Sequence, residues 1–329
     1  MKLAAHVASA PAKVILFGEH FVVYGAPALL AAIDRRTIAK ARKRADDKIV
    51  IKSDIGASAE YTRSGIKILQ GGKKAKAILD PIHDAIRRAH GERRRSSGLQ
   101  VELSSNIPYG IGLGSSAASC VASIAAADSL FASHGRTWIC ERAIESERMI
   151  HRNSSGADCY VSTFGGVMLY SKDRGYKKIK AGNQLRLVVG STGILHSTGR
   201  LVERVRKFRE SNPREFRSLS DKADEICANA LQAIELGKIE TLGQLMSQNQ
   251  QLLRQIGVSH SKCELLITLC LNAGALGAKI TGAGGGGAII ALARSEKDSS
   301  RIAAAIRKQG YDSIEVRTDC KGLVLQKPS

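Results

Sequence analysis

The sequence has no long apolar run and no paired-cysteine motif. None of its apolar stretches approaches the roughly 20 residues that a membrane-spanning helix needs, and the N-terminus lacks the uninterrupted apolar core of a secretion signal. The seven cysteines include no Cys-x-x-Cys pair, and several lie in apolar helical stretches, where a thiol acts as a small hydrophobe. We therefore expect reduced thiols, a cytoplasmic location and no membrane partner.

Aromatic residues are scarce, at 4%, although the chain carries a formal net charge of +20. Such a charge attracts nucleic acid, an anionic membrane surface or anionic small substrates. Surfaces that bind nucleic acid commonly add aromatic stacking platforms. The densest basic runs, at 73–76 and 93–95, lie in Gly- and Ser-flanked stretches without interleaved aromatics. We interpret these runs as solvated loops and expect no nucleic-acid partner.

The length of 329 residues predicts two domains, because domains commonly hold roughly 100 to 200 residues. The basic stretch 172–180 breaks the hydrophobic periodicity, and a new apolar strand starts at Leu185. We therefore place the boundary near 182, with domains at 1–182 and 183–329.

The first half predicts a hairpin on a sheet, followed by strands and helices. Ser115 or Ser116 is expected to cap the first long helix, since serine is a favoured N-cap. The predicted elements are extended segments at 7–11, 14–17 and 21–24 with a turn at Gly18, strands at 48–53, 99–105 and 166–170, and helices at 78–90, 115–131 and 137–151.

The second half predicts one strand, several amphipathic helices, two strands, a helix and a final strand. The expected ranges are strands at 185–189, 277–281, 287–293 and 313–318, and helices at 198–210, 219–236, 238–254, 261–274 and 297–309. This is a ferredoxin-like order with extra helices inserted. The fold class is therefore α+β, and no internal repeat or low-complexity segment competes with it.

A glycine-rich loop, Pro108-Tyr-Gly-Ile-Gly-Leu-Gly-Ser-Ser-Ala-Ala118, precedes the first long helix. Glycines allow backbone amides to approach an oxyanion closely, and a helix N-terminus adds unsatisfied amides and a positive dipole end. The pattern indicates a phosphate cradle, although no Walker GxxxxGK[ST] motif is present. A tight turn into the helix is the alternative.

A second glycine cluster, Thr281-Gly-Ala-Gly-Gly-Gly-Gly287, joins two predicted strands. A two-residue hairpin turn requires only one or two glycines, so the excess favours close approach by a ligand or by another loop. A merely flexible loop is the alternative.

Two acidic residues and one lysine complete the candidate chemistry. In a phosphate site one carboxylate can hold Mg²⁺ while another orients and deprotonates an attacking hydroxyl, and Glu147 and Asp158 are candidates. Lys13 lies in an apolar stretch, where it must snorkel or meet a carboxylate. Glu19 and His20 at the following turn can supply polar contacts. An exposed helix charge is the alternative for Glu147.

Three ordered motifs resemble those of the galactokinase, homoserine kinase, mevalonate kinase and phosphomevalonate kinase (GHMP) family. They are Ser9-Ala-Pro-Ala-Lys-Val-Ile-Leu-Phe-Gly-Glu-His20, the loop Gly110–Ala118, and Lys279-Ile-Thr-Gly-Ala-Gly-Gly-Gly-Gly287. The resemblance spans nearly the whole chain. It implies a two-domain fold, with an N-terminal α/β domain like a ribosomal-protein domain (domain 2 type) and a C-terminal ferredoxin-like domain, and ATP bound between them.

Three further stretches resemble the mevalonate kinase branch of this family: 18–25, 147–158 and 249–260. The resemblance implies phosphorylation of the 5-hydroxyl of mevalonate by ATP with Mg²⁺, and a homodimer is common in the family. It implies Asp158 as catalytic base with Lys13 beside it, and Ser116 and Glu147 on the metal. The residues implied around ATP are Pro108, Gly110, Ile111, Gly112, Leu113, Gly114, Ser115, Ser116, Ala117 and Ala118. Those implied on the substrate side are Glu19, His20, Thr198, Gly282, Ala283 and Gly284.

The chain departs from the family pattern near the acceptor. Arg152 and Ser154 stand where the family usually has Gly and Pro, and His196 stands where it has an Arg. We hypothesise that Arg152, Arg200 or His196 binds the mevalonate carboxylate, because each is basic and close to a matched motif.

Three rival functions remain open at this point. Another GHMP kinase, for phosphomevalonate, a sugar or homoserine, would share all three motifs and differ in the acceptor. A basic nucleic-acid-binding protein would account for the net charge but not for the glycine clusters or Asp158. A catalytically silent family member is the third, although every residue assigned to chemistry is present.

Overall fold

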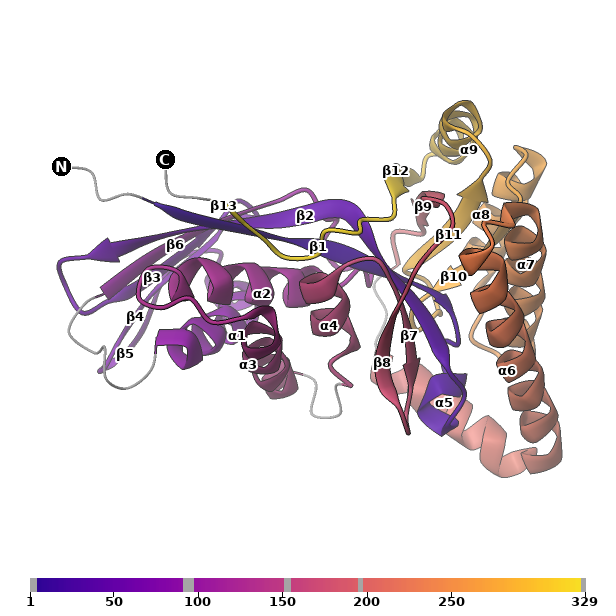
Figure 1. The fold of residues 1–329 in the computed structure, drawn as a ribbon, viewed down its shortest axis with the longest axis horizontal. Coiled ribbons are helices and arrows are strands. Elements are labelled where there is room, and N and C mark those ends of the chain that lie inside the picture. The colour runs from indigo at the N-terminus through magenta and orange to yellow at the C-terminus, as the bar shows by residue number, and fades with distance from the viewer. Residues whose placement is uncertain (1–4, 91–97, 151–154, 195–197, 327–329) are drawn as a thin grey trace.

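The computed structural model describes residues 5–90, 98–150, 155–194 and 198–326. Within these ranges the chain forms two units, each built on one sheet with its own helices (Figure 1). No helix among the described residues is long and apolar enough to cross a membrane.

The first unit is a large sheet with helices on one face (Figure 1). Its elements are β1 (His6–Phe17), η1 (Phe21–Tyr24), β2 (Ala28–Arg44), β3 (Ile49–Ser53), β4 (Ala57–Thr62), β5 (Gly65–Gln70), α1 (Gly72–His90), β6 (Gly98–Ser105), α2 (Ser115–Asp128), α3 (Arg136–Ile150), α4 (Ala157–Phe164), β7 (Val167–Ser171) and β8 (Gly175–Ile179). The described part of this sheet has nine strands in the order β13-β1-β2-β6-β3-β4-β5, with β7 paired to β2 and β8.

The long hairpin of β1 and β2 forms the centre of the first unit. The two strands pair antiparallel from His6 opposite Ala41 to Phe17 opposite Leu29. The first part of β2 also pairs with β7, and its second part pairs with β6. Strand β2 therefore has a strand neighbour on both sides along most of its length.

Helix α2 packs directly under this hairpin. Most of its residues are small and buried, in the sequence Ser-Ser-Ala-Ala-Ser-Cys-Val-Ala-Ser-Ile-Ala-Ala-Ala-Asp. It contacts β1, β2 and the helices α1, α3 and α4. Small side chains permit these close approaches on several sides at once, and they hold the N-terminus of α2 at a defined place beside β1.

The second unit has the predicted ferredoxin-like order. Its elements are β9 (Arg186–Ser191), α5 (Thr198–Ser211), α6 (Pro213–Glu235), α7 (Ile239–Gln255), α8 (Ser261–Asn272), β10 (Gly277–Thr281), β11 (Ala288–Ala293), α9 (Glu296–Lys308) and β12 (Asp312–Arg317). The strands pair antiparallel in the order β10-β11-β9-β12. The described residues between β9 and β10 form four helices: one belongs to the ferredoxin-like order and three are the extra helices that the sequence predicted.

The chain returns to the first unit at its end. Strand β13 (Val324–Gln326) pairs with β1 at the edge of the large sheet, and Thr318 bridges to Ile33 of β2. Residues 318–326, which belong to the predicted range 183–329, therefore contact the first unit. The division near 182 stays a prediction.

Four local predictions were wrong. The basic run 73–76 has exposed lysines, as expected, but it lies in helix α1 and not in a loop, because Ala75 is buried on the inner face of that helix. Residues Phe21–Tyr24 form a 3-10 helix, because turn bonds such as that from the Val22 amide to the Gly18 carbonyl replace a strand partner. The N-cap of α2 is Gly114, and Ser115 is already helical. The segments 7–11 and 14–17 form one strand, which pairs with β2.

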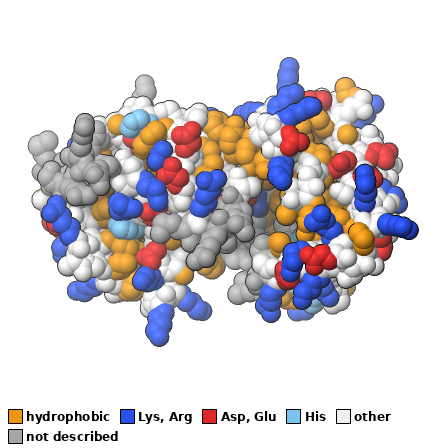
Figure 2. Space-filling view, turned by 90° about the horizontal axis from the view of Figure 1, so that it is seen from below, with side chains coloured by type: hydrophobic (Ala, Val, Ile, Leu, Met, Phe, Trp, Pro, Cys, Tyr) orange, Lys and Arg blue, Asp and Glu red, His pale blue; other side chains and the backbone are white. Residues whose placement is uncertain are grey.

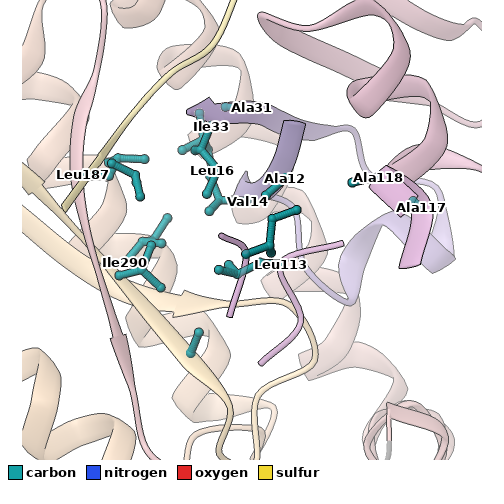
Figure 3. Packing of buried hydrophobic residues seen from close by; sticks show 14 of the residues in the cluster. Ala12, Val14, Leu16, Ala31, Ile33, Leu113, Ala117, Ala118, Leu187 and Ile290 are labelled. Atoms are coloured by element: carbon teal, nitrogen blue, oxygen red, sulfur yellow. The ribbon is translucent and has the colours of Figure 1, made fainter. Parts of the chain in front are cut away.

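The apolar core is continuous between the two units. Figure 3 shows Val14 and Leu16 of β1 packed with Leu113 of the glycine loop, and Leu187 and Ile290 of the second sheet lie in the same cluster. These five side chains are at most 1% exposed. The loop is thus anchored through a buried leucine at the junction of the units.

Basic side chains are distributed over the surface. On the face drawn in Figure 2, Lys and Arg side chains are spread over both units and mixed with Asp and Glu. The described residues of this face therefore form no continuous basic track of the kind that follows a nucleic-acid backbone.

Arg36 of β2 ties the returning C-terminal segment to the large sheet. Its guanidinium pairs with Asp319 and donates to the carbonyls of Ser9 (2.8 Å) and Gly322 (2.6 Å). The Asp319 side chain is only 9% exposed. Loss of the arginine would leave this carboxylate buried without its counter-ion.

We expect Arg36→Ala to lower the free energy of unfolding by about 3 kcal/mol, because one partner of a largely buried ion pair is removed. Urea denaturation measures the change. Arg42→Ala is the matched control, since Arg42 is an exposed residue of the same strand. Equal stability of the two variants would contradict this role.

Candidate active site

The glycine loop before α2 has the geometry of an anion cradle. Gly110, Gly112 and Gly114 all have positive φ, at 79°, 84° and 75°. Alternating left-handed residues turn successive backbone amides toward one side, and such nests bind anions. Gly112 has open space where a side chain would stand. The N-terminus of α2 follows at once, so its free amides and dipole add to the same region.

Leu113 holds the loop against β1. Its side chain is 1% exposed within the core, and its carbonyl accepts a hydrogen bond of 2.9 Å from the Lys13 amide. A buried residue between two glycines fixes the loop while the glycine backbone remains accessible. The same hydrogen bond from the Lys13 amide places the Lys13 side chain beside the loop.

Lys13 and Asp158 meet against this loop. The Lys13 ammonium lies 3.3 Å from Asp158 Oδ1 and donates to the Gly112 carbonyl at 3.2 Å. A Cβ added to Gly114 would lie 3.0 Å from Lys13 Cγ and 3.4 Å from Asp158 Oδ2. Asp158 is in the first turn of α4, and its side chain remains 31% exposed, so it is accessible to a bound molecule.

Glu147 comes from α3 and faces both α2 and α4. It is 5% exposed. Burial, and then the Glu147 carboxylate, raise the pKa of the thiols of Cys120 on α2 and Cys159 on α4. Cys120 is one turn after Ser116, and Cys159 is next to Asp158. Glu147 therefore belongs to the same neighbourhood as the loop and the aspartate.

The described residues contain no cluster of three or more His, Cys, Asp or Glu that could hold a metal ion. One carboxylate and one hydroxyl, from Glu147 and Ser116, are nevertheless the donor set that suits Mg²⁺ when phosphate oxygens and waters complete its coordination. Ser116 is half-buried at the start of α2. The two residues fit a metal that arrives with a nucleotide.

Glu19 and His20 lie at the turn after β1 and point into the junction of the two units. Glu19 is 2% exposed and pairs with Lys279 of β10. His20 is 6% exposed, and its Nε2 lies 2.8 Å from the Ala283 carbonyl. Burial raises the pKa of Glu19, which Lys279 opposes, and lowers the pKa of His20.

The second glycine cluster packs mainly against other loops of the chain. Added Cβ atoms at Gly284, Gly285 and Gly286 would lie 2.4 Å from the Val258 carbonyl oxygen, 2.8 Å from Leu201 Cδ1 and 2.7 Å from Ile194, respectively. Close approach by other segments of the chain therefore accounts for these three glycines: a loop at Gly284 and Gly286, and helix α5 at Gly285. Gly282, next to Ala283, has no atom within 4 Å of such a Cβ and remains open.

The predicted carboxylate-binding residues are only partly described. Arg200 is exposed in the first turn of α5, and Thr198 begins that helix. Arg152, Ser154 and His196 lie outside the described residues. The proposed contact of Arg152, Arg200 or His196 with the acceptor carboxylate stays a prediction.

Lys279 is a buried partner of Glu19 that the sequence analysis did not assign to the site. Its side chain is 0% exposed, and it lies between the buried Ala278 and Ile280. A lysine inside an apolar strand must meet a carboxylate, and that argument, which we applied to Lys13, would also have singled out Lys279.

The chain is similar to known proteins over nearly its full length. The descriptions "GHMP kinases N terminal domain" and "GHMP kinases C terminal" match residues 76–166 and 230–312. Mevalonate kinase of Thermococcus sibiricus is 38% identical, with 97% of this chain and 98% of the relative aligned. Mevalonate kinase of Pyrococcus furiosus is also 38% identical, with 98% of both aligned.

Solved structures give the same picture. The crystal structure of L. major mevalonate kinase in complex with R-mevalonate matches with a TM-score of 0.82 and 28% identity, and covers 95% of both chains. This match confirms the predicted two-domain fold class, in which the glycine loop and the ferredoxin-like unit meet.

Gly114→Ala tests whether the loop must approach Lys13 and Asp158. The variant adds a methyl group 3.0 Å from Lys13 in a left-handed backbone, and Gly310→Ala is the control, because Gly310 has a similar φ of 79° with open space. Both should cost about 1–2 kcal/mol in unfolding free energy. Only Gly114→Ala should also lower turnover, by about 10²-fold. Equal turnover of the two variants would show that the loop position is not critical.

Proposed function

The chain belongs to the GHMP kinase family, in its mevalonate kinase branch, and on that premise we propose that it transfers the γ-phosphoryl group of ATP to the 5-hydroxyl of mevalonate. The observation that carries the proposal is the Lys13–Asp158 pair against the Gly110–Gly114 loop. The Lys13 ammonium and the accessible Asp158 carboxylate thus lie beside Gly114, at the end of the proposed phosphate loop.

The loop and the start of α2 hold the phosphate chain of ATP. Backbone amides between Gly110 and Ala117 donate to the phosphate oxygens, and the dipole of α2 favours their negative charge. The bare glycine backbone permits this close approach. These contacts orient the γ-phosphoryl group toward Asp158.

Asp158 accepts the proton of the 5-hydroxyl as that oxygen attacks phosphorus, and the bond from phosphorus to the leaving oxygen of ADP breaks. Lys13, whose ammonium lies 3.3 Å from Asp158 Oδ1, offsets the negative charge of Asp158 and of the transferring group. Positioning and electrostatic stabilisation supply most of the catalysis in phosphoryl transfer. Ser116 and Glu147 would hold Mg²⁺, which neutralises charge on the phosphates when bound.

The acceptor side lies toward Glu19, His20, Thr198 and the open end of the second glycine loop at Gly282–Gly284. His20 and Ala283 are hydrogen-bonded partners from the two units, so this side is built by both. A basic residue for the mevalonate carboxylate is proposed among Arg152, His196 and Arg200.

Cellular context is part of the proposal. Six of the seven free cysteines are buried and Cys320 is exposed, which suits reduced thiols in a cytoplasmic enzyme. A homodimer stays a prediction.

An ATP-consumption assay across mevalonate, phosphomevalonate, galactose and homoserine tests the acceptor. Mevalonate should be the preferred acceptor, and mass and phosphorus NMR of the product should show a phosphate monoester on the primary alcohol. Preference for another of the four acceptors would assign the chain to a different reaction of the family. A salt-dependent gel shift without ATP consumption would favour the nucleic-acid alternative.

Asp158→Asn should lower kcat by about 10²- to 10⁴-fold, which is the usual contribution of a general base. ATP affinity, measured by equilibrium binding, should stay unchanged because the loop is intact. Asp173→Asn is the control, as Asp173 is an exposed carboxylate of the β7–β8 turn. Wild-type turnover of Asp158→Asn would exclude it as the base.

Glu147→Gln should raise the Mg²⁺ concentration for half-maximal rate about tenfold, since a neutral amide is a weaker ligand for a hard cation. Titration of Mg²⁺ at saturating ATP and mevalonate measures the shift. Glu141→Gln, an exposed position of the same helix, should leave the titration unchanged. An unchanged titration of Glu147→Gln would remove this residue from the metal site.

A further inference from the structure

The two units are joined next to the site by contacts between two short segments. Thr281 at the end of β10 accepts from the Ile15 amide at 2.9 Å and donates to the Ile15 carbonyl at 3.1 Å. Two residues earlier on β10, Lys279 pairs with Glu19, and beyond Thr281 the Ala283 carbonyl contacts His20. The turn 18–20 is therefore held by β10 and the loop that follows it.

Lys279 is buried more completely than an ammonium group normally allows. Its side chain is 0% exposed in a strand whose five residues are all buried. The ammonium donates to Glu19 and to the Ile280 carbonyl at 2.6 Å. Burial of an unpaired charge costs far more than most single contacts contribute. Glu19 is thus the group that makes a charged lysine tolerable at this position.

Glu19 is held by one oxygen only. Oε1 pairs with Lys279, while Oε2 is buried and has no hydrogen-bond partner among the described residues. The next residue, His20, is the one non-glycine residue in the described ranges with a positive φ, at 63°. A strained backbone of this kind persists only where its surroundings hold it. The Glu19–Lys279 pair supplies such a restraint from inside the second unit.

Several charged or titratable groups face Glu19. Lys279 comes from β10, Lys13 from β1 and Cys227 from α6, and His20 is adjacent in the turn. Burial raises the pKa of the Cys227 thiol and lowers the pKa of His20. Neither group therefore becomes charged near neutral pH. Of these groups, Lys279 is the one that donates a hydrogen bond to the Glu19 carboxylate.

We propose that Lys279 is a positioning residue for the acceptor side of the site, which acts through Glu19 to hold the His20 turn against the Ala283 loop. Lys279 itself touches no substrate, because it lies in the interior of the second unit. Glu19 likewise supports the site from behind, with its carboxylate directed into the junction. This inference rests on the proposed function in placing the acceptor beside this turn.

The pH dependence of the acceptor KM in Lys279→Met distinguishes a positioning role of Lys279 from a contribution to stability alone. Without the ammonium, the buried Glu19 carboxylate loses its counter-ion, so its pKa rises further above the ordinary value. Below that pKa, Glu19 is neutral and stays inside, but the turn has lost the ion pair that held it, so the acceptor KM is already raised. Above it, the ionised carboxylate is drawn toward water and displaces the turn. The KM for the acceptor should therefore increase as pH rises.

The experiment measures kcat and both KM values from pH 6 to 9 for the wild type, Lys279→Met, the double variant Glu19→Gln/Lys279→Met and the control Lys297→Met. Lys297 is an exposed residue of α9. Lys279→Met should raise the acceptor KM about tenfold or more at the high end of this pH range, with the KM for ATP unchanged. The double variant should keep a raised acceptor KM that no longer varies with pH, and the control should match the wild type.

Two results would overturn the proposal. One is a Lys279→Met enzyme with the wild-type acceptor KM and pH profile, even if its thermal stability is lower. The other is a double variant with the wild-type acceptor KM, which would show that the pair does not hold the turn. If Lys279→Met fails to fold, the neutral double variant decides the question alone by the same KM comparison.

The outcome is separable from that of the proposed function. The kinetic comparison uses whichever alcohol the wild-type enzyme phosphorylates. If that alcohol is not mevalonate, the proposed function fails, while the ratio of variant to wild-type KM still decides the role of Lys279.

Discussion

The contact of strand β1 with the glycine loop is the constraint on which the site depends. The Lys13 amide binds the Leu113 carbonyl, while the Lys13 side chain reaches Gly112 and Asp158. Two residues further on, Ile15 binds Thr281 of the second unit. One strand thus sets the distance between the phosphate cradle, the carboxylate and the ferredoxin-like unit. Displacement of β1 would disturb all three at once.

Buried charges at the junction of the units fall into two pairs with different environments. Lys13–Asp158 has one partly exposed member, so it is accessible to substrate. Glu19–Lys279 is closed from solvent on both sides. The open pair suits chemistry, because its carboxylate can receive a proton, whereas the closed pair suits support of the backbone. The two pairs are close together. Burial raises the pKa of Glu19, and the charge of Lys13 opposes that effect after the larger opposition from Lys279. The charges of the site are therefore coupled to those at the junction of the two units.

Local patterns predicted much of this arrangement. The glycine loop, the helix that follows it, and the ferredoxin-like strand order could be inferred because hydrophobic periodicity and glycine spacing are properties of neighbouring residues. The hairpin β7–β8, the return of β13 to β1 and the Glu19–Lys279 pair were not inferred. Lys279 lies 260 residues from Glu19, and no period in the chain links such distant segments. The 3-10 turn at Phe21 was missed because its apolar residues resemble a short strand, while tertiary contacts decide its form.

The central claim is that nucleotide phosphates bind at the Gly110–Gly114 loop with Asp158 facing the acceptor alcohol. A crystal structure of the enzyme with a non-hydrolysable ATP analogue, Mg²⁺ and mevalonate tests it most directly. We expect the γ-phosphate on the loop amides and the 5-hydroxyl within hydrogen-bond distance of Asp158. Phosphates bound elsewhere, or an acceptor whose hydroxyl does not reach Asp158, would contradict it.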